Sequence, residues 1–167
     1  QFFREQIALI GIQEARTTEG CRVSDNYKIY SSGFRQCGNS KNFGCELWQT
    51  LPFCTMPDGR KIGQHNCKIT ITGQDPKIMV VYFEGPLSLQ VVVAHAPCVS
   101  AERPMDVVKQ WWEQTAEHVG NSRSDNVIVL IDANAPLADH ETQFFGLHHA
   151  EPMNPQGLAF QEIGRAH

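Results

Sequence analysis

Residues 126–140 read NVIVLIDANAPLADH, where five consecutive apolar residues, Val127 to Ile131, are followed at once by Asp132 and Asn134. A short apolar run that ends in polar residues is typical of a buried β-strand. Side chains two positions apart in a strand lie on the same face, about 7 Å from each other. We therefore expect a strand whose end presents a carboxylate and an amide together.

The composition of the chain predicts one globular domain. It has 167 residues, of which 41% are hydrophobic and 19% charged, enough for a sizeable core. No apolar run reaches the roughly 18 residues that a membrane-spanning helix needs. The first residues form no secretory leader and lack an initiator Met, so we expect a piece of a longer polypeptide that is intracellular, nuclear or cytoplasmic, and not secreted.

The net charge of −4 and the pI of about 6.0 argue against one class of nucleic-acid binder. A protein that coats DNA by neutralising phosphates is usually basic. An enzyme that holds a phosphate through a metal ion is not excluded by this balance.

Six cysteines stand at positions 21, 37, 45, 54, 67 and 98. No two of them form a CxxC pair, and their spacing matches no zinc pattern. The even number permits three disulfides, but without a secretory context we expect free, mostly buried thiols in a reducing compartment.

Apolar runs separated by Gly, Pro, Asn and Asp predict seven strands. They cover residues 7–12, 27–30, 43–48, 67–72, 77–83, 87–96 and 126–132. The three runs between residues 67 and 96 are joined by short turns, which favours an antiparallel meander.

Two helices are predicted as well. The first covers residues 104–120, with Pro104 in the first turn, Gly120 at the end, and a buried stripe at helical spacing that consists of Val108, Trp111, Trp112, Thr115 and Val119. We expect the two tryptophans to pack in the core and not to stack on bases. The second helix begins at Asn154 and Pro155 and continues to the last residue, His167.

These elements together predict an α/β fold. The runs 91–94 and 127–131 are apolar on both faces, so we expect each strand to be covered on both sides. Antiparallel meanders combined with helices favour a four-layer α/β sandwich, in which two mainly antiparallel sheets pack face to face and helices lie outside. We interpret residues 1–167 as one incomplete domain of this kind.

Three predicted strands end on residues suited to phosphoester chemistry. They end on Glu14, on His95, and on Asp132 with Asn134. A glutamate suits a hard cation such as Mg²⁺, an aspartate can activate water, and an amide or imidazole can donate to a phosphoryl oxygen. Each residue alone is more typical of a solvated loop, a turn or a structural contact. Their recurrence at strand ends favours metal-assisted attack on a phosphoester.

The order of these motifs resembles that of the endonuclease/exonuclease/phosphatase superfamily, which has the fold of pancreatic deoxyribonuclease. The resemblance covers nearly the whole chain and rests on IALIGIQEAR (7–16), FGCELW (43–48), VVVAHAP (91–97), the Trp-rich helix and VIVLIDANA (127–135). HHAEPMNPQGLAFQEI (148–163) is most similar to the endonuclease domains linked to retrotransposon reverse transcriptases.

The resemblance implies a role for each candidate residue. Glu14 would bind Mg²⁺ or Mn²⁺, supported by Gln13. Asp132 would position and activate the attacking water, while Asn134 and His95 would contact the scissile phosphate. The family's Asn on an earlier strand and its C-terminal Ser-Asp-His are not in this sequence, so we expect the 167-residue piece alone to be inactive.

Some residues depart from the family pattern. Cys45 and Glu46 stand where small or apolar residues are usual, which leaves the packing of that strand open. His148, His149 and Glu151 could suggest a metal site, but adjacent histidines point apart, so we do not assign one. Asp139 and His140 are expected in a loop.

Three functions remain open from the sequence. The first is a DNA endonuclease domain, with DNA as substrate and fused to further domains such as a reverse transcriptase. The second is a phosphatase or phosphodiesterase that acts on a phosphoinositide, nucleotide or other small phosphoester, which the acidic balance favours. The third is a degenerate, non-catalytic module. The sequence predicts no oligomeric state.

Overall fold

The computed structural model describes residues 7–51, 54–55, 58–59, 61–62, 67–71, 76–84, 88–100, 103–136 and 152–165. The chain divides into two compact units. The first unit comprises Gln1–His95 and Ser122–Ile131, and the second comprises Ala96–Asn121 and Asp132–His167. Asp139 and His140, which are expected in a loop, and His148, His149 and Glu151, to which no metal site is assigned, lie outside the described residues.

The first unit contains a four-stranded antiparallel sheet with the order β1-β6-β3-β2. Its strands are β1 (Leu9–Ile12), β2 (Gly20–Val23), β3 (Tyr27–Ser31) and β6 (Glu46–Thr50). In the register, Glu46 lies opposite Ile12 of β1 on one side and Ser31 of β3 on the other. The sequence missed β2, whose residues are all exposed and so show no apolar pattern.

A second sheet has the order β12-β11-β10-β9. Its strands are β9 (Cys67–Ile71), β10 (Ile78–Phe83), β11 (Leu89–His95) and β12 (Val127–Asp132). The pairs β9–β10 and β10–β11 are antiparallel, which confirms the predicted meander. Against β12, the N–H groups of Gln90 and Ala96 donate to the carbonyls of Asn126 and Asp132. Since both partners advance by six residues, β11 and β12 run parallel.

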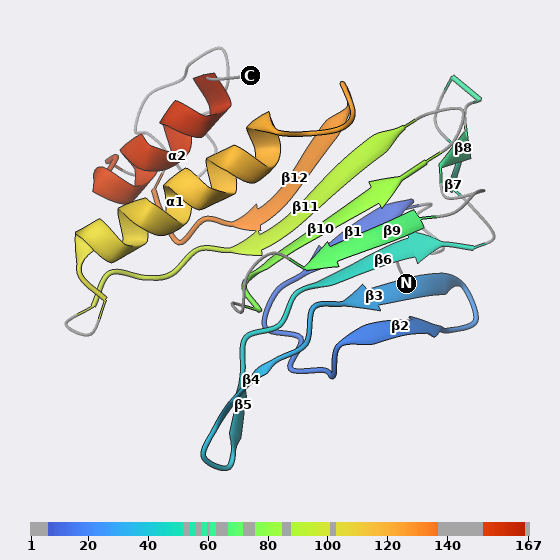
Figure 1. Cartoon of the computed structure of the whole chain (residues 1–167), viewed down its shortest axis with the longest axis horizontal. Coiled ribbons are helices and arrows are strands. Elements are labelled where there is room, and N and C mark those ends of the chain that lie inside the picture. The colour runs from blue at the N-terminus through green and yellow to red at the C-terminus, as the bar shows by residue number, and fades with distance from the viewer. Residues whose placement is uncertain are drawn as a thin grey trace. The chain divides into compact units, whose positions relative to one another are not determined.

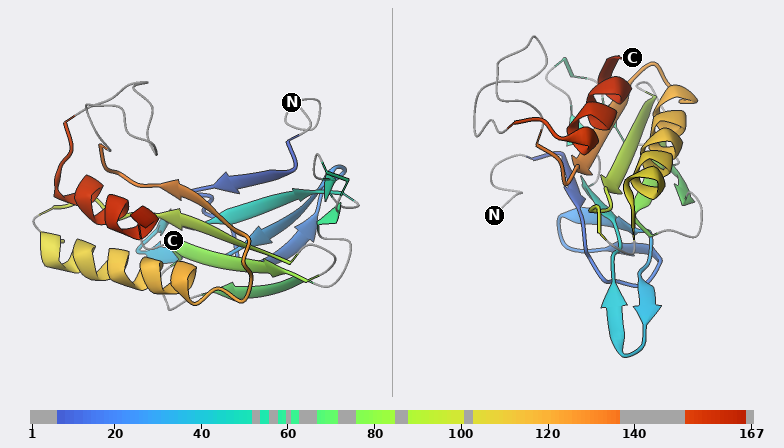
Figure 2. Two further views of the ribbon diagram at one scale, coloured as in Figure 1. Left: turned by 90° about the horizontal axis from the view of Figure 1, so that it is seen from above. Right: turned by 90° about the vertical axis from the view of Figure 1, so that its left-hand side faces the viewer.

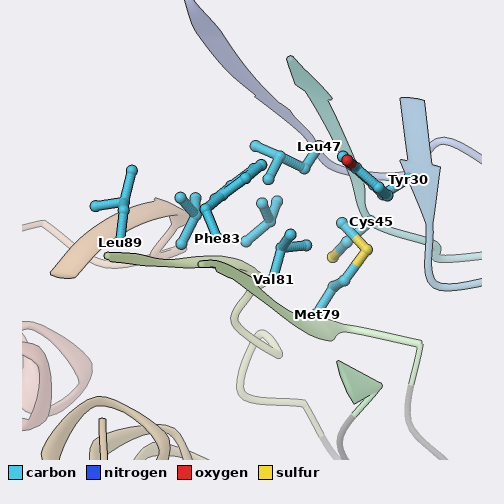
Figure 3. Close-up of a cluster of buried hydrophobic side chains, with 9 residues drawn as sticks. Tyr30, Cys45, Leu47, Met79, Val81, Phe83 and Leu89 are labelled. Carbon is cyan, nitrogen blue, oxygen red and sulfur yellow. The ribbon is translucent and has the colours of Figure 1, made fainter. Parts of the chain in front are cut away.

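The hydrophobic core of the first unit lies between the two sheets (Figure 3). Tyr30, Cys45 and Leu47 come from the first sheet and its entry, and the second sheet contributes Met79, Val81, Phe83, Leu89, Val91 and Val93. The rings of Tyr30 and Phe83 meet edge to face, with centroids 6.3 Å apart. Each fully buried aliphatic or aromatic side chain contributes about 1.5–3 kcal/mol through the removal of apolar surface from water. The predicted α/β class with two mainly antiparallel sheets packed face to face is therefore confirmed.

Burial on both faces was predicted for β11 and β12, and the prediction is right for β11 alone. In β11, residues 89–94 are buried on both faces, as the apolar pattern predicted. In β12 the prediction of full coverage is wrong, because no residue of the strand is fully buried and Val129 is 36% exposed. Among the described strands, β12 is the outer strand of its sheet and pairs only with β11.

Two short hairpins complete the described strands. β4 (Arg35–Cys37) pairs with β5 (Ser40–Asn42), and β7 (Cys54–Thr55) pairs with β8 (Lys61–Ile62). The hairpin β4–β5 extends away from the sheets (Figure 1). Its residues are polar and mostly exposed, so hydrophobic periodicity could not reveal it.

The second unit contains helices α1 (Met105–Gly120) and α2 (Pro155–Arg165), which lie side by side (Figure 2). The buried residues of α1 are the five that the helical spacing predicted, and Pro104 caps the helix. The ring of Trp112 packs against that of Phe160, with centroids 5.4 Å apart. Packing of the tryptophans in a core is thus confirmed.

The exposure of the four cysteines whose side chains the structure describes differs from the expectation that the thiols are mostly buried. Cys21, Cys37 and Cys98 are free thiols, as expected, but all three are exposed, whereas Cys45 is buried. The expectation of mostly buried thiols is wrong because Cys21 and Cys37 lie on exposed strands and Cys98 follows the end of β11.

Candidate active site

Glu14 lies in the loop Gln13–Glu19, which connects β1 to β2. A Cβ atom on Gly11 would come within 2.7 Å of the Leu130 side chain, so only glycine allows β1 to approach β12 so closely here. The amide of Gln13 then donates to the carbonyl of Leu130 at 3.3 Å. This bond joins the residue after β1 to Leu130, near the end of β12.

The backbone of this loop is held in an unusual conformation. Glu14 and Arg16 have φ angles of 53° and 54°, in the left-handed region that side chains other than glycine rarely adopt. The N–H groups of Ala15 and Arg16 donate to the carbonyls of Gly44 and Phe43, at 2.9 and 3.0 Å. These bonds hold the loop against the segment that enters β6.

The carboxylate of Glu14 forms an ion pair with Arg16 at 3.1 Å. Both side chains are about half exposed, at 49% and 58%. An ion pair so open to water contributes about 0–1 kcal/mol. The pair is therefore weak enough for a cation to replace the guanidinium.

His95 is the last residue of β11, at the place that the sequence predicted. Its N–H donates to the carbonyl of Lys77 at 2.9 Å, which continues the pairing of β10 with β11 to the end of the strand. The residue is partly buried, so a rigid strand holds its backbone while part of the side chain meets solvent.

In the second unit, Asp132 and Asn134 form a compact turn at the end of β12. The N–H of Asn134 donates to Oδ1 of Asp132 at 3.1 Å, and its side-chain amide donates to the carbonyl of Ala96 at 2.7 Å. The N–H of Ala96 in turn donates to the carbonyl of Asp132 at 2.8 Å. Asn134 has a φ of 47°, which asparagine tolerates better than most residues. The three bonds fix both side chains relative to the strand end.

Comparison with known proteins gives one informative likeness. No family model and no curated protein matches the chain. Among solved structures, the chain is similar to the endonuclease domain of TRAS1, a telomere-specific non-LTR retrotransposon, with a TM-score of 0.53 and 14% identity. The likeness covers 98% of this chain and 61% of that one. The chain has a deoxyribonuclease I-like fold.

The deoxyribonuclease I-like fold confirms the resemblance in architecture, and the chain spans 61% of the length of the solved domain. Of the predicted site residues, Gln13, Glu14 and His95 belong to the first unit and Asp132 and Asn134 to the second. The roles of these five residues stay predictions.

The sequence missed a buried carboxylate in this deoxyribonuclease I-like fold. Glu46 is only 2% exposed, and its oxygens accept four hydrogen bonds. The donors are Thr17 Oγ1 at 2.6 Å, Arg22 at 2.7 Å, Ser31 Oγ at 2.9 Å and Trp48 Nε1 at 2.7 Å. Burial by itself would raise the pKa of Glu46, but the hydrogen bonds outweigh it and the pKa lies below its ordinary value. Its departure from the family pattern in FGCELW was the available signal.

Among the described residues, Glu14 is the candidate ligand for a divalent cation. In the part of the chain that the structure describes, no three His, Cys, Asp or Glu side chains gather closely enough to hold a metal ion. Mg²⁺, however, keeps several waters and needs only one or two protein carboxylates. The half-exposed carboxylate of Glu14 fits this requirement.

No described helix is long and apolar enough to cross a membrane.

Proposed function

We propose that the chain is part of a divalent-metal-dependent phosphodiesterase that cuts DNA as an endonuclease. Glu14 holds Mg²⁺ or Mn²⁺, Asp132 activates water, and Asn134 and His95 contact the scissile phosphate. The similar solved domain is an endonuclease, which supports a nuclease over other activities of phosphoester hydrolases.

The observation that carries the proposal is the strained backbone at two residues chosen from the sequence. Among the described residues, the non-glycine positions with positive φ are Glu14, Arg16, Phe43 and Asn134. Left-handed conformations of residues other than glycine cost about 1–3 kcal/mol, less for asparagine than for glutamate, and they persist where the surrounding structure holds them, which is common at active sites. Glu14 and Asn134 stand at the ends of two different strands, so one local turn does not explain both.

The contacts of each side chain are compatible with its proposed role. The amide of Asn134 has two N–H groups, and its bond to Ala96 orients the group while a second N–H can donate to a phosphate oxygen. Asp132 accepts from the N–H of Asn134, which aims the carboxylate without neutralising it. A bound cation supplies positive charge that stabilises the negative charge developing on the phosphoryl group.

A basic hairpin favours DNA over a small phosphoester. Residues 34–43 include Arg35 and Lys41 and no acidic residue, although the whole chain has a net charge of −4. Arg35 lies over the ring of Phe43 at 6.0 Å, and Lys41 over that of Phe34 at 4.6 Å. Exposed cations held on aromatic rings suit an extended phosphate backbone.

The small-phosphoester alternative is supported by the acidic balance of the whole chain. A panel of supercoiled plasmid, a phosphoinositide and a nucleotide, each with Mg²⁺, separates the two. Turnover of the small substrates with an intact plasmid would favour the alternative. The third alternative, a non-catalytic module, predicts no turnover of any member of the panel.

The central test is plasmid nicking by the protein that contains this chain, with Asp132→Asn as the variant. We expect the nicking rate to fall by at least about 100-fold, because the amide cannot accept a proton from water. Circular dichroism and the thermal midpoint establish that the variant is folded.

The matched control is Asp125→Asn, the same change at an exposed residue just before β12. It should nick like the unaltered protein. If Asp132→Asn also nicks at the unaltered rate, the proposed role of Asp132 and the endonuclease mechanism are rejected.

A further inference from the structure

We propose that Glu46 is a positioning residue for Glu14, acting through Thr17 to hold the loop Gln13–Glu19 in its strained conformation. This inference rests on the proposed function, in which Glu14 binds the cation.

Glu46 stands in the register at the place where the loop leaves the sheet. It lies directly opposite Ile12, the last residue of β1, so the loop begins beside it. Its carboxylate also lies at the point where Thr17 returns toward β2, and the bond between Thr17 Oγ1 and Glu46 Oε1 is 2.6 Å long. Residue 46 thus lies beside one end of the turn through its backbone pairing and contacts the other end through its side chain.

The other bonds of Glu46 fasten it to the sheet. Ser31 of β3, Arg22 of β2 and Trp48 of β6 all donate to the carboxylate. Arg22 also donates to Ser31 Oγ at 2.9 Å, which ties two of these donors to each other. Three strands therefore hold Glu46 rigid, and Thr17 is the donor that belongs to the loop.

This arrangement accounts for how the left-handed residues are maintained. The backbone bonds of Ala15 and Arg16 to Gly44 and Phe43 hold one side of the turn. The bond of Thr17 to Glu46 holds the side leading to β2. Without it, Glu14 and Arg16 can relax from their φ values of 53° and 54° toward commoner conformations. The carboxylate of Glu14 would then spend less time where the cation binds.

The variant that tests the link is Thr17→Val, which keeps the shape of the side chain and removes the hydroxyl. We expect hydrogen exchange at the amides of Ala15 and Arg16 to become about 10-fold faster, the effect of losing one hydrogen bond to a carboxylate. We expect the Mn²⁺ dissociation constant to rise about 5- to 10-fold. The half-saturating Mg²⁺ concentration in nicking should rise with it, while kcat at saturating Mg²⁺ changes less than about twofold.

The matched control is Trp48→Phe, which removes another donor from Glu46 without touching the loop. It should lower the thermal midpoint while leaving the exchange of Ala15 and Arg16 and the Mn²⁺ affinity unaltered. Hydrogen exchange and Mn²⁺ binding are measured on the protein that contains the chain, so neither readout depends on activity.

The positioning role is overturned if Thr17→Val leaves exchange and Mn²⁺ affinity unchanged. It is also overturned if Trp48→Phe changes both by the same factor, because Glu46 would then act through stability alone. Failure of the proposed function has a different signature, since Glu14→Gln would leave the Mn²⁺ affinity unchanged even where Thr17→Val accelerates exchange.

Discussion

At the residue scale, Glu46 shows how a buried charge is accommodated within the first sheet, on the face opposite that of its neighbours Cys45 and Leu47, which pack into the core. A carboxylate without partners would be expensive to bury, and four donors compensate for the loss of water around this one. Hydrogen bonds to a charged group are each worth about 1.5–3 kcal/mol. The same bonds that make burial possible also keep the carboxyl group ionised.

The lowered pKa of Glu46 predicts a pH dependence of stability. A carboxyl group with a lower pKa in the folded chain stabilises the fold fully above its unfolded value, near 4.5, and loses this contribution as pH falls through the folded value. We expect the unfolding free energy of the unaltered protein to decrease below about pH 4.5 more steeply than that of Glu46→Gln. Urea unfolding between about pH 7 and about pH 3 measures both, and parallel curves would contradict the prediction.

Gly44 is the second residue that the loop of Glu14 requires. Its φ is +104°, and an added Cβ would lie 2.8 Å from the carbonyl oxygen of Gly33 and 3.1 Å from the nitrogen of Arg16. We expect Gly44→Ala to lower the unfolding free energy by at least about 2 kcal/mol, from backbone strain and steric overlap together. Urea denaturation measures the loss.

Gly38 is the control for the strain alone. It has a φ of +59° and no atom within 4 Å of an added Cβ. Gly38→Ala should therefore cost only about 1 kcal/mol. Equal losses in the two variants would show that the contact of Gly44 with Gly33 and Arg16 is unimportant.

At the scale of elements, the hairpin β4–β5 carries the exposed cations Arg35 and Lys41 and is bonded to the loop of Glu14 through Phe43. Phe43 accepts the backbone bond of Arg16, and its ring lies under Arg35 at 6.0 Å. Lys77, which is buried, lies over the same ring at 4.3 Å. The hairpin is thus anchored beside the loop that carries Glu14, within the first unit.

The hairpin prediction concerns the salt dependence of DNA binding. Replacing Arg35 and Lys41 together by Ala should weaken duplex binding and reduce the slope of log K against log salt by about 1.8, the loss of two phosphate contacts. Fluorescence anisotropy over a series of NaCl concentrations measures the slope. The control removes two exposed cations elsewhere, Lys109 and Arg123, and should leave it unchanged. A slope that the hairpin variant does not alter would exclude the hairpin as a DNA contact.

At the scale of the whole molecule, the sequence predicted what hydrophobic periodicity encodes. The strands with apolar runs, the meander from β9 to β11 and the buried stripe of α1 were all foreseen, because burial imposes a spacing on apolar residues. The hairpin β4–β5 and the strand β2 escaped because exposed strands carry no such spacing.

The candidate site was predicted only in part, for a related reason. Glu14, His95 and Asp132 were chosen as candidates because each follows an apolar run that ends abruptly, and their roles stay predictions. Glu46 and Thr17 were not, because their link joins residues 29 positions apart through a register that no local pattern reveals. The prediction that both faces of β12 are buried was wrong, because the place of a strand in its sheet depends on topology and not on the composition of the strand.

The parallel pairing of β11 with β12 also limits how this chain can diverge. Two parallel neighbours need a long crossover, and here residues 97–125 supply it, so insertions and deletions in that stretch can be absorbed without moving either strand. Within β12, by contrast, insertions and deletions would not be tolerated. A slip of one residue would turn Asp132 to the other face of the sheet and bring Ile131 into its place. Length variants should therefore accumulate between the strands and be absent inside β12.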